Sequence, residues 1–281
     1  MVSKMAASAM GLAKLWVEFD TVIQAMIRTQ LQATADGAIV FDAAAMAQAG
    51  DAVRFDPLWF EAAPWRAQGA ETTRGGRGGA MYVDAPFGRC VLRHYQRGGM
   101  VASVMGDRYL WTGAERTRSF AEFHLLADLH GHGLRVPAPI AARYTRQGVH
   151  YRADLITRRI EGATTLAELV AAGGCSVEVA ARVGATVAEF HAAGACHADL
   201  NAHNVLLVDD AVWLVDFDRG QKRAPARAWQ LANLARLRRS LIKLGAASNG
   251  EAVFDRHVWN PLMAAYEQRF EASAARGGAQ P

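Results

Sequence analysis

A short polar run in the middle of the chain contains the side chains that phosphoryl transfer requires. Residues 197–204 read HADLNAHN, and an apolar strand further along ends at Asp216 in the sequence VDFD. In sites with this pattern the first aspartate, here Asp199, accepts the proton of the attacking hydroxyl. Asn204 and Asp216 would hold Mg²⁺ against the phosphates of ATP. Each piece is common alone, but their order and spacing together predict a phosphoryl-transfer site that uses ATP and Mg²⁺.

Structural roles are also open to these residues. Asp199 and Asn204 could form turns, because short polar side chains bond to their own backbone. They lie, however, in a tight polar loop between an expected helix and an expected buried strand, where folds often place a site. Asp216 follows an apolar strand, and a carboxylate buried there needs a cation or several hydrogen bonds. His197 is expected to support the site without touching the chemistry, and His203 is expected to be structural.

A glycine-rich stretch upstream matches part of a loop that covers phosphates. The pattern Gly-x-Gly-x-x-Gly-x-Val is met by Gly76, Gly78 and Val83, whereas Met81 stands where the third glycine would be. Glycines let the backbone approach phosphate oxygens and point its N–H groups at them. We therefore expect Gly76 and Gly78 to contact the nucleotide, with a plain flexible turn as the alternative.

The strand after this loop supplies a cation for the phosphates. Kinases have Val-Ala-Ile-Lys here, and residues 90–93 of this chain read CVLR. None of the four lysines of the chain lies in or beside this strand. Arg93 is therefore predicted to bind the phosphates, with Arg89 and Arg97 as alternatives. Strand alternation favours Arg93.

A helix is expected at residues 115–130, because its apolar side chains recur at helical spacing. It would supply Glu122 to orient Arg93, with Glu115 as the alternative. A second helix is expected from residue 177 to residue 193, with Ser176 as its N-cap.

These elements predict an α+β chain with a two-lobed, protein-kinase-like fold. Residues 37–157 would form an N-lobe with an antiparallel sheet, and residues 158–281 a mainly helical C-lobe that contains the catalytic loop 197–204. Residues 158–162 would be the hinge, where backbone groups bind adenine. Residues 1–36 read as a helical N-terminal extension.

The composition is that of a globular chain in a reducing compartment. Of its 281 residues 51% are hydrophobic and 21% are charged. The three cysteines form no Cys-x-x-Cys pair, which excludes a cysteine zinc module and argues against a disulfide scaffold. No apolar run is long enough to span a bilayer, and no secretion signal is evident.

Basic side chains gather in one segment. From Arg219 to Lys243 there are eight basic residues and no acidic residue, and leucines recur there at helical spacing. The segment could be a core helix with arginines facing solvent, or a surface for an anionic substrate or anionic lipid headgroups. Nucleic acid is the weaker interpretation, because no nucleic-acid module accompanies the charge.

The segment after Asp216 leaves little room for a peptide substrate. Within about ten residues it runs into the basic helix, and no Ala-Pro-Glu motif follows. We infer a small hydroxyl acceptor, and no obligate protein partner is indicated.

Four runs together resemble the Kdo (3-deoxy-D-manno-octulosonic acid) kinase family of bacterial lipopolysaccharide sugar kinases. They are LRHY at residues 92–95 with Gly98-Gly99, YRADL at 151–155, HADLNAHN at 197–204 and DFDRG at 216–220. The likeness extends from about residue 37 to about residue 245. Arginine in the usual lysine position is similar to the family pattern, whereas the altered third glycine departs from the kinase loop.

The resemblance implies transfer of the γ-phosphate of ATP to the 4-hydroxyl of Kdo on a lipid A precursor. It also implies a peripheral protein at the cytoplasmic side of the bacterial inner membrane, against an anionic surface. By the same resemblance Asp218 is expected to assist at the metal, and Arg219 to meet a phosphate or the Kdo carboxylate.

Three other functions stay open. A heptose kinase of the same core oligosaccharide would share every motif and differ only in its acceptor. An antibiotic-type phosphotransferase has a similar catalytic run but a different strand at Arg93. A catalytically inactive protein that binds nucleotide or lipid is disfavoured by the intact Asp199, Asn204 and Asp216.

Overall fold

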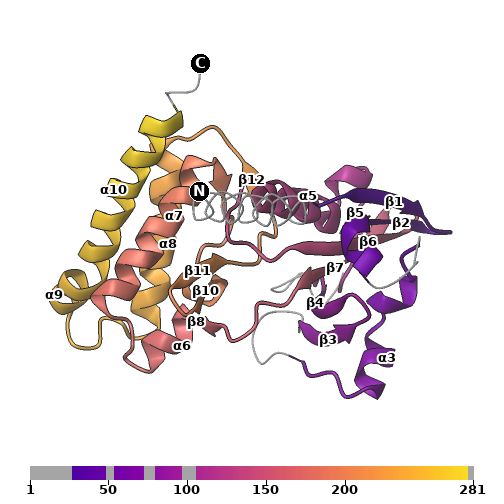
Figure 1. Ribbon diagram of the computed structural model, residues 1–281, viewed down its shortest axis with the longest axis horizontal. Coiled ribbons are helices and arrows are strands. Elements are labelled where there is room, and N and C mark those ends of the chain that lie inside the picture. Colours follow the sequence, from indigo (N-terminus) through magenta and orange to yellow (C-terminus); the bar gives the residue numbers. More distant parts are fainter. Residues whose placement is uncertain (1–26, 49–53, 73–79, 97–105, 278–281) are drawn as a thin grey trace, which may run out of the picture.

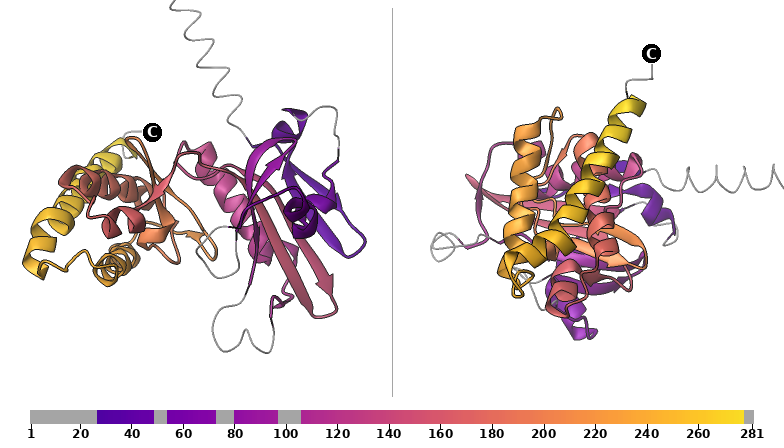
Figure 2. Two further views of the ribbon diagram at one scale, coloured as in Figure 1. Left: turned by 90° about the horizontal axis from the view of Figure 1, so that it is seen from below. Right: turned by 90° about the vertical axis from the view of Figure 1, so that its left-hand side faces the viewer.

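Two lobes of different composition make up the protein. The computed structural model describes residues 27–48, 54–72, 80–96 and 106–277. A sheet lobe and a helical lobe lie side by side and are joined by residues 159–163, close to the predicted hinge (Figures 1 and 2). The predicted α+β, two-lobed architecture is therefore confirmed.

The N-lobe is built on a seven-stranded sheet whose strand pairs are all antiparallel. Its order is β1-β2-β6-β7-β4-β3, and β5 pairs with the outer end of β7. The strands are β1 (Thr29–Ala33), β2 (Gly37–Asp42), β3 (Met81–Ala85), β4 (Gly88–His94), β5 (Tyr109–Leu110), β6 (Pro139–Gln147) and β7 (His150–Arg158).

The first strand corrects the predicted helical extension at residues 1–36. Residues 29–33 form β1, which pairs with β2, so the N-lobe begins before residue 37. Four of the five residues of β1 are exposed, and an exposed edge strand has little apolar pattern to distinguish it. Residues 1–26 lie outside the described ranges.

Helices cover both faces of this sheet. On one face lies α5 (Arg118–Gly131), and on the other lie α2 (Ala43–Gln48), η1 (Pro57–Phe60) and α3 (Ala62–Ala67). The sequence predicted α5 from residue 115. Its first three predicted residues instead lie in and beside the 3₁₀ turn η2 (Ala114–Arg116), and an extended Thr117 precedes the helix.

The C-lobe is mainly helical and holds short strands around the predicted catalytic loop, residues 197–204. The predicted helix 177–193 is present as α7, and Ser176 caps it by accepting a hydrogen bond from the Val179 N–H at 3.3 Å. The basic segment is helical from Arg227 to Lys243, with Leu234, Leu237 and Leu241 fully buried, whereas its residues 219–226 precede the helix. The elements are β8 (Thr164–Thr165), α6 (Leu166–Ala171), α7 (Val177–Ala192), β9 (Ala195–Cys196), η3 (Ala202–Asn204), β10 (Val205–Val208), β11 (Ala211–Leu214), β12 (Gln221–Lys222), α8 (Arg227–Lys243), α9 (Glu251–Phe254), the π-helix η4 (Asp255–Trp259) and α10 (Asn260–Gly277).

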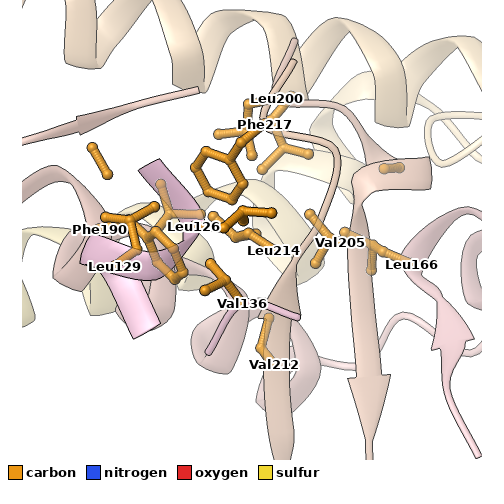
Figure 3. Close-up of a cluster of buried hydrophobic side chains, with 14 of the residues drawn as sticks. Leu126, Leu129, Val136, Leu166, Phe190, Leu200, Val205, Val212, Leu214 and Phe217 are labelled. Atoms are coloured by element: carbon orange, nitrogen blue, oxygen red, sulfur yellow. The ribbon is translucent and has the colours of Figure 1, made fainter. Parts of the chain in front are cut away.

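One hydrophobic cluster continues from the N-lobe into the C-lobe (Figure 3). Leu126 and Leu129 of α5 lie near Phe217, which stacks on Phe190 of α7 with ring centroids 5.8 Å apart. Because Phe217 is fixed from both lobes, its neighbours Asp216 and Asp218 are held at the boundary between them. Among the described helices none is both long and apolar enough to cross a bilayer.

We expect Gly184→Ala to lower the free energy of unfolding by about 1–3 kcal/mol, because overpacking strains a close-packed interior. A Cβ at residue 184 of α7 would overlap the backbone carbonyl of Leu262 in α10. Urea unfolding measures the loss. Gly131→Ala, at the end of α5, is the matched control, because its Cβ would meet no atom within 4 Å. Equal stability of Gly184→Ala and wild type would contradict this close helix contact.

Candidate active site

The predicted base, Asp199, lies on the loop between β9 and η3, with its side chain 62% exposed. Its Oδ2 accepts a hydrogen bond from Asn201 Nδ2 at 3.1 Å, and its backbone N–H donates to His197 Nδ1 at 3.1 Å. The loop therefore holds the carboxylate in place while leaving it open to a substrate hydroxyl.

His197 supports this loop from the protein interior. It is buried, and its Nε2–H donates to the Val215 carbonyl at 2.9 Å while Nδ1 accepts from the Asp199 N–H. Burial lowers the pKa of His197, which keeps the ring neutral with its proton on Nε2. The ring thus joins the catalytic loop to the residue that precedes Asp216, in agreement with the expected supporting place.

Asn204 and Asp216 lie at the two adjacent ends of the β10–β11 hairpin. The Asn204 carbonyl accepts a hydrogen bond from the Val215 N–H at 3.0 Å, and Asn204 Nδ2 donates to the Asp199 carbonyl at 3.0 Å. Asp216 has a φ of 61°, a left-handed conformation that few residues other than glycine adopt. The fold thus brings Asp199, Asn204 and Asp216 together.

The predicted cation, Arg93, reaches the same place from the N-lobe. Its guanidinium forms ion pairs with Glu122 of α5 and with Asp216. Burial alone would lower the pKa of Arg93, but the facing Glu122 carboxylate raises it. Burial also raises the pKa of Glu122 to about 7, and the charge of Arg93 opposes that rise. The contact expected between Arg93 and Glu122 is therefore present.

Tyr95 is a third member of this group and was not predicted. Its hydroxyl donates to Glu122 Oε2 at 2.6 Å and accepts from Arg93 Nη2 at 3.1 Å. The Arg93 guanidinium also lies 4.8 Å from the centre of the Tyr95 ring. Strand alternation, which puts residues 93 and 95 on one face, is the sequence signal that could have revealed it.

The alternative residues lie elsewhere. Arg89 is exposed and faces Asp84 at 3.7 Å and Glu161 at 3.5 Å. Glu115 is exposed, and its carboxylate lies 3.4 Å from His124 Nε2, whereas Arg93 pairs with Glu122. Arg97 lies outside the described residues, as do Gly76 and Gly78 of the predicted phosphate loop.

Asp218 and Arg219, the residues predicted to meet the metal and the substrate, lie just beyond Asp216. Both carboxylate oxygens of Asp218 bind the guanidinium of Arg118 at the start of α5, with Nε to Oδ1 at 2.8 Å. This contact ties the two lobes together, and the sequence did not reveal it. Arg219 is exposed and forms no ion pair within the described part of the chain. Their predicted roles at metal and substrate stay predictions.

The site has oxygens suited to Mg²⁺. Neither Asn204 Oδ1 nor Asp216 Oδ2 accepts a hydrogen bond from the described residues. Mg²⁺ commonly takes one or two protein oxygens and completes its shell with phosphate and water oxygens. Within the same ranges no group of three His, Cys, Asp or Glu side chains could hold a metal alone. The donors present therefore suit a metal that is shared with phosphates.

A histidine next to Arg93 stabilises this end of the sheet. His94 Nδ1 lies 2.6 Å from Asp154 Oδ1, and Nε2 lies 3.0 Å from Asp107 Oδ2. Arg143 Nε donates to the other oxygen of Asp154 at 2.9 Å. The hydrogen bond to Asp154 is the main cause of the raised pKa of His94, and burial opposes it.

The stabilisation by His94 should depend on pH. Because the folded-state pKa is raised, this stabilisation is complete below the unfolded-state pKa of about 6.5 and is lost as pH rises through the folded-state value. We expect His94→Gln to cost about 1–2 kcal/mol at pH 5.5 and less at pH 8.5. Thermal unfolding across this range measures the difference, with the exposed His257→Gln as control. A loss that grows with pH would contradict this prediction.

Comparisons with known proteins identify a matching family and similar proteins. The family described as "Lipopolysaccharide kinase (Kdo/WaaP) family" matches residues 62–266. A protein of Xanthomonas oryzae pv. oryzae named 3-deoxy-D-manno-octulosonic acid kinase is 50% identical over 218 residues, which cover 77% of this chain and 85% of that protein. Proteins of the same name from Stenotrophomonas maltophilia and Xylella fastidiosa are 49% and 46% identical, over 77% and 78% of this chain and 85% and 86% of their own length. A solved structure described as "WaaP in complex with acyl carrier protein" is 16% identical, with a TM-score of 0.44, and the match covers 75% of this chain and 92% of that one.

Proposed function

This chain belongs to the lipopolysaccharide kinase (Kdo/WaaP) family, and we propose that it transfers the γ-phosphate of ATP to Kdo. The acceptor hydroxyl is the 4-hydroxyl of a Kdo residue on a lipid A precursor, in assembly of the lipopolysaccharide inner core. The observation that supports this most strongly is the meeting of Asp199, Asn204, Asp216 and the Arg93–Glu122 pair at one lobe boundary. Over 77% of its length, the chain is 49–50% identical to proteins named 3-deoxy-D-manno-octulosonic acid kinase.

Asp199 is the group that receives the acceptor hydroxyl. Its exposed carboxylate accepts the hydroxyl proton as the new O–P bond forms and the bond from the γ-phosphorus to the ADP oxygen breaks. Asn201 and His197 hold Asp199 in orientation through its side chain and backbone. General-base assistance of this kind contributes about 10²–10⁴-fold to rates.

Arg93 is the phosphate-binding cation. Glu122 and Tyr95 fix its guanidinium from the N-lobe side, so that its remaining N–H groups face the C-lobe carboxylate Asp216. A positioned cation at this point stabilises the charge that moves onto ADP. Asn204 and Asp216 would hold Mg²⁺, which supplies further neutralisation of phosphate charge when it is bound.

The acceptor implies a place in the cell. A Kdo-bearing lipid A precursor is anionic and membrane-embedded, so the protein works peripherally at the cytoplasmic side of the inner membrane. The exposed basic residues of α8, among them Arg239 and Lys243, would favour an anionic surface.

A heptose kinase is the nearest alternative, because it would use the same site. Steady-state phosphorylation of a Kdo-terminated lipid A precursor and of a heptose-bearing core separates the two functions. We expect kcat/KM to favour the Kdo acceptor. A preference for the heptose acceptor would keep the kinase mechanism and contradict the proposed acceptor.

A protein that binds nucleotide without turnover is the alternative from another class. Thermal stabilisation by ATP and Mg²⁺, with no phosphate transferred to either acceptor, would support it and contradict the proposed function.

A further inference from the structure

A second arginine approaches the catalytic aspartate from the C-lobe. Arg236 lies on α8, and its Nη1 is 3.4 Å from Asp199 Oδ1. The same helix face contacts the catalytic loop one turn later, where Ser240 Oγ accepts a hydrogen bond from the Ala202 N–H at 3.1 Å. The helix is therefore docked against the loop, which fixes where Arg236 can reach.

This contact leaves most of the guanidinium available. The side chains of Arg236 and Asp199 are 44% and 62% exposed, and the 3.4 Å contact uses one of the five N–H groups of the arginine. Two other arginines of α8 are held in ion pairs. Arg227 pairs with Glu267, and Arg238 pairs with Glu251 and Asp255. Arg236 is thus a cation beside the reacting hydroxyl, separate from the phosphate-binding Arg93.

The proposed acceptor has a group that matches this cation. Kdo is an acid, and its carboxyl carbon is attached to C2, two ring bonds from the carbon that bears the 4-hydroxyl. When the 4-hydroxyl is bound at Asp199, the carboxylate of the same sugar therefore lies less than one sugar ring from Asp199. Arg236, which contacts Asp199, is close enough to reach it. Arginine binds carboxylates in a forked, charge-assisted geometry.

We propose that Arg236 binds the carboxylate of the acceptor and so selects an acid sugar over a neutral one. This inference rests on the proposed function. It assigns the carboxylate to Arg236, whereas Arg219 had been expected to meet a phosphate or the Kdo carboxylate. Arg236 moves from Asp199 to the acceptor carboxylate when the sugar enters, which leaves Asp199 Oδ1 open to the hydroxyl.

A pair of acceptors tests this assignment: the octyl glycoside of Kdo and the same glycoside with its carboxylate converted to a carboxamide. For the wild-type protein we expect kcat/KM to be about tenfold or more higher for the acid, mainly through KM, because a charge-assisted hydrogen bond is lost in the amide. Arg236→Gln should lower kcat/KM for the acid to the level of the amide and bring the ratio close to one. Arg238→Gln, which removes an ion-paired arginine from another face of α8, should keep the wild-type ratio.

Three results would overturn the assignment. If the wild-type protein has nearly equal kcat/KM for the acid and the amide, it does not recognise the carboxylate, although the proposed function would still hold. A ratio unchanged in Arg236→Gln, with kcat lowered for both acceptors, would make Arg236 a positioning residue for Asp199 alone. Collapse of the ratio in Arg219→Gln and not in Arg236→Gln would return the carboxylate to Arg219. A different result would contradict the proposed function itself: the protein phosphorylates the heptose-bearing core but phosphorylates neither the two glycosides nor the Kdo-bearing lipid.

Discussion

Asp199→Asn is expected to lower kcat by about 10²–10⁴-fold, because the amide cannot accept the proton of the acceptor hydroxyl. The change is nearly isosteric, and the Asp199 side chain is mostly exposed, so the fold should be retained. Steady-state kinetics with ATP and the Kdo-bearing precursor measure the loss, and circular dichroism checks the fold.

Asp210→Asn is the matched control for this change. Asp210 is fully exposed in the β10–β11 turn, where it pairs with Arg182, and its substitution should leave kcat near the wild-type value. Full activity of Asp199→Asn would remove Asp199 from the mechanism, whatever the behaviour of the control.

Arg93→Gln is expected to have the next largest effect, a loss of about 10²–10³-fold in kcat/KM. The substitution removes the charge that we propose binds the phosphates, and it leaves the buried Glu122 without its cation. Loss of that cation raises the pKa of Glu122 further above its already raised value of about 7, so the variant should also lose stability as pH rises from 6 to 9. Kinetics with varied ATP and thermal unfolding across this pH range measure the two effects.

Two variants make this prediction specific. Arg89→Gln lies on the same strand but has only exposed partners, and it should keep near-wild-type kinetics. Arg93→Lys keeps the charge but cannot bridge Glu122 and Asp216 with a planar fork, so it should fall between Arg93→Gln and wild type. Wild-type kcat/KM for Arg93→Gln would exclude Arg93 as the phosphate-binding residue.

The residues expected to do chemistry could be found from the sequence because they are close together in it. Asp199 and Asn204 share one loop, and Asp216 follows the strand hairpin that begins at that loop. The partner Glu122 could be chosen because helical spacing and one strand position leave few carboxylates that can reach Arg93. Short-range patterns of this kind do not depend on knowing how distant segments pack.

Contacts between distant segments could not be found in this way. Arg118 reaches Asp218 across a hundred positions, and Arg236 reaches Asp199 across 37. Arg236 is one of five basic residues of α8, and Arg118 follows Arg116 by two positions, so nothing local distinguishes either arginine. The strand at residues 29–33 was missed for a related reason. It is held by its pairing with β2, and its mostly exposed side chains form no apolar pattern that would indicate a strand.

Tandem mass spectrometry of a Kdo-bearing lipid A precursor, after incubation with the protein, ATP and Mg²⁺, tests the central claim most directly. We expect the wild-type protein to add a single phosphate to the 4-hydroxyl of the Kdo residue, and Asp199→Asn to add none in the same time. A phosphate located on another sugar, or phosphorylation only of a heptose-bearing core, would contradict Kdo as the acceptor.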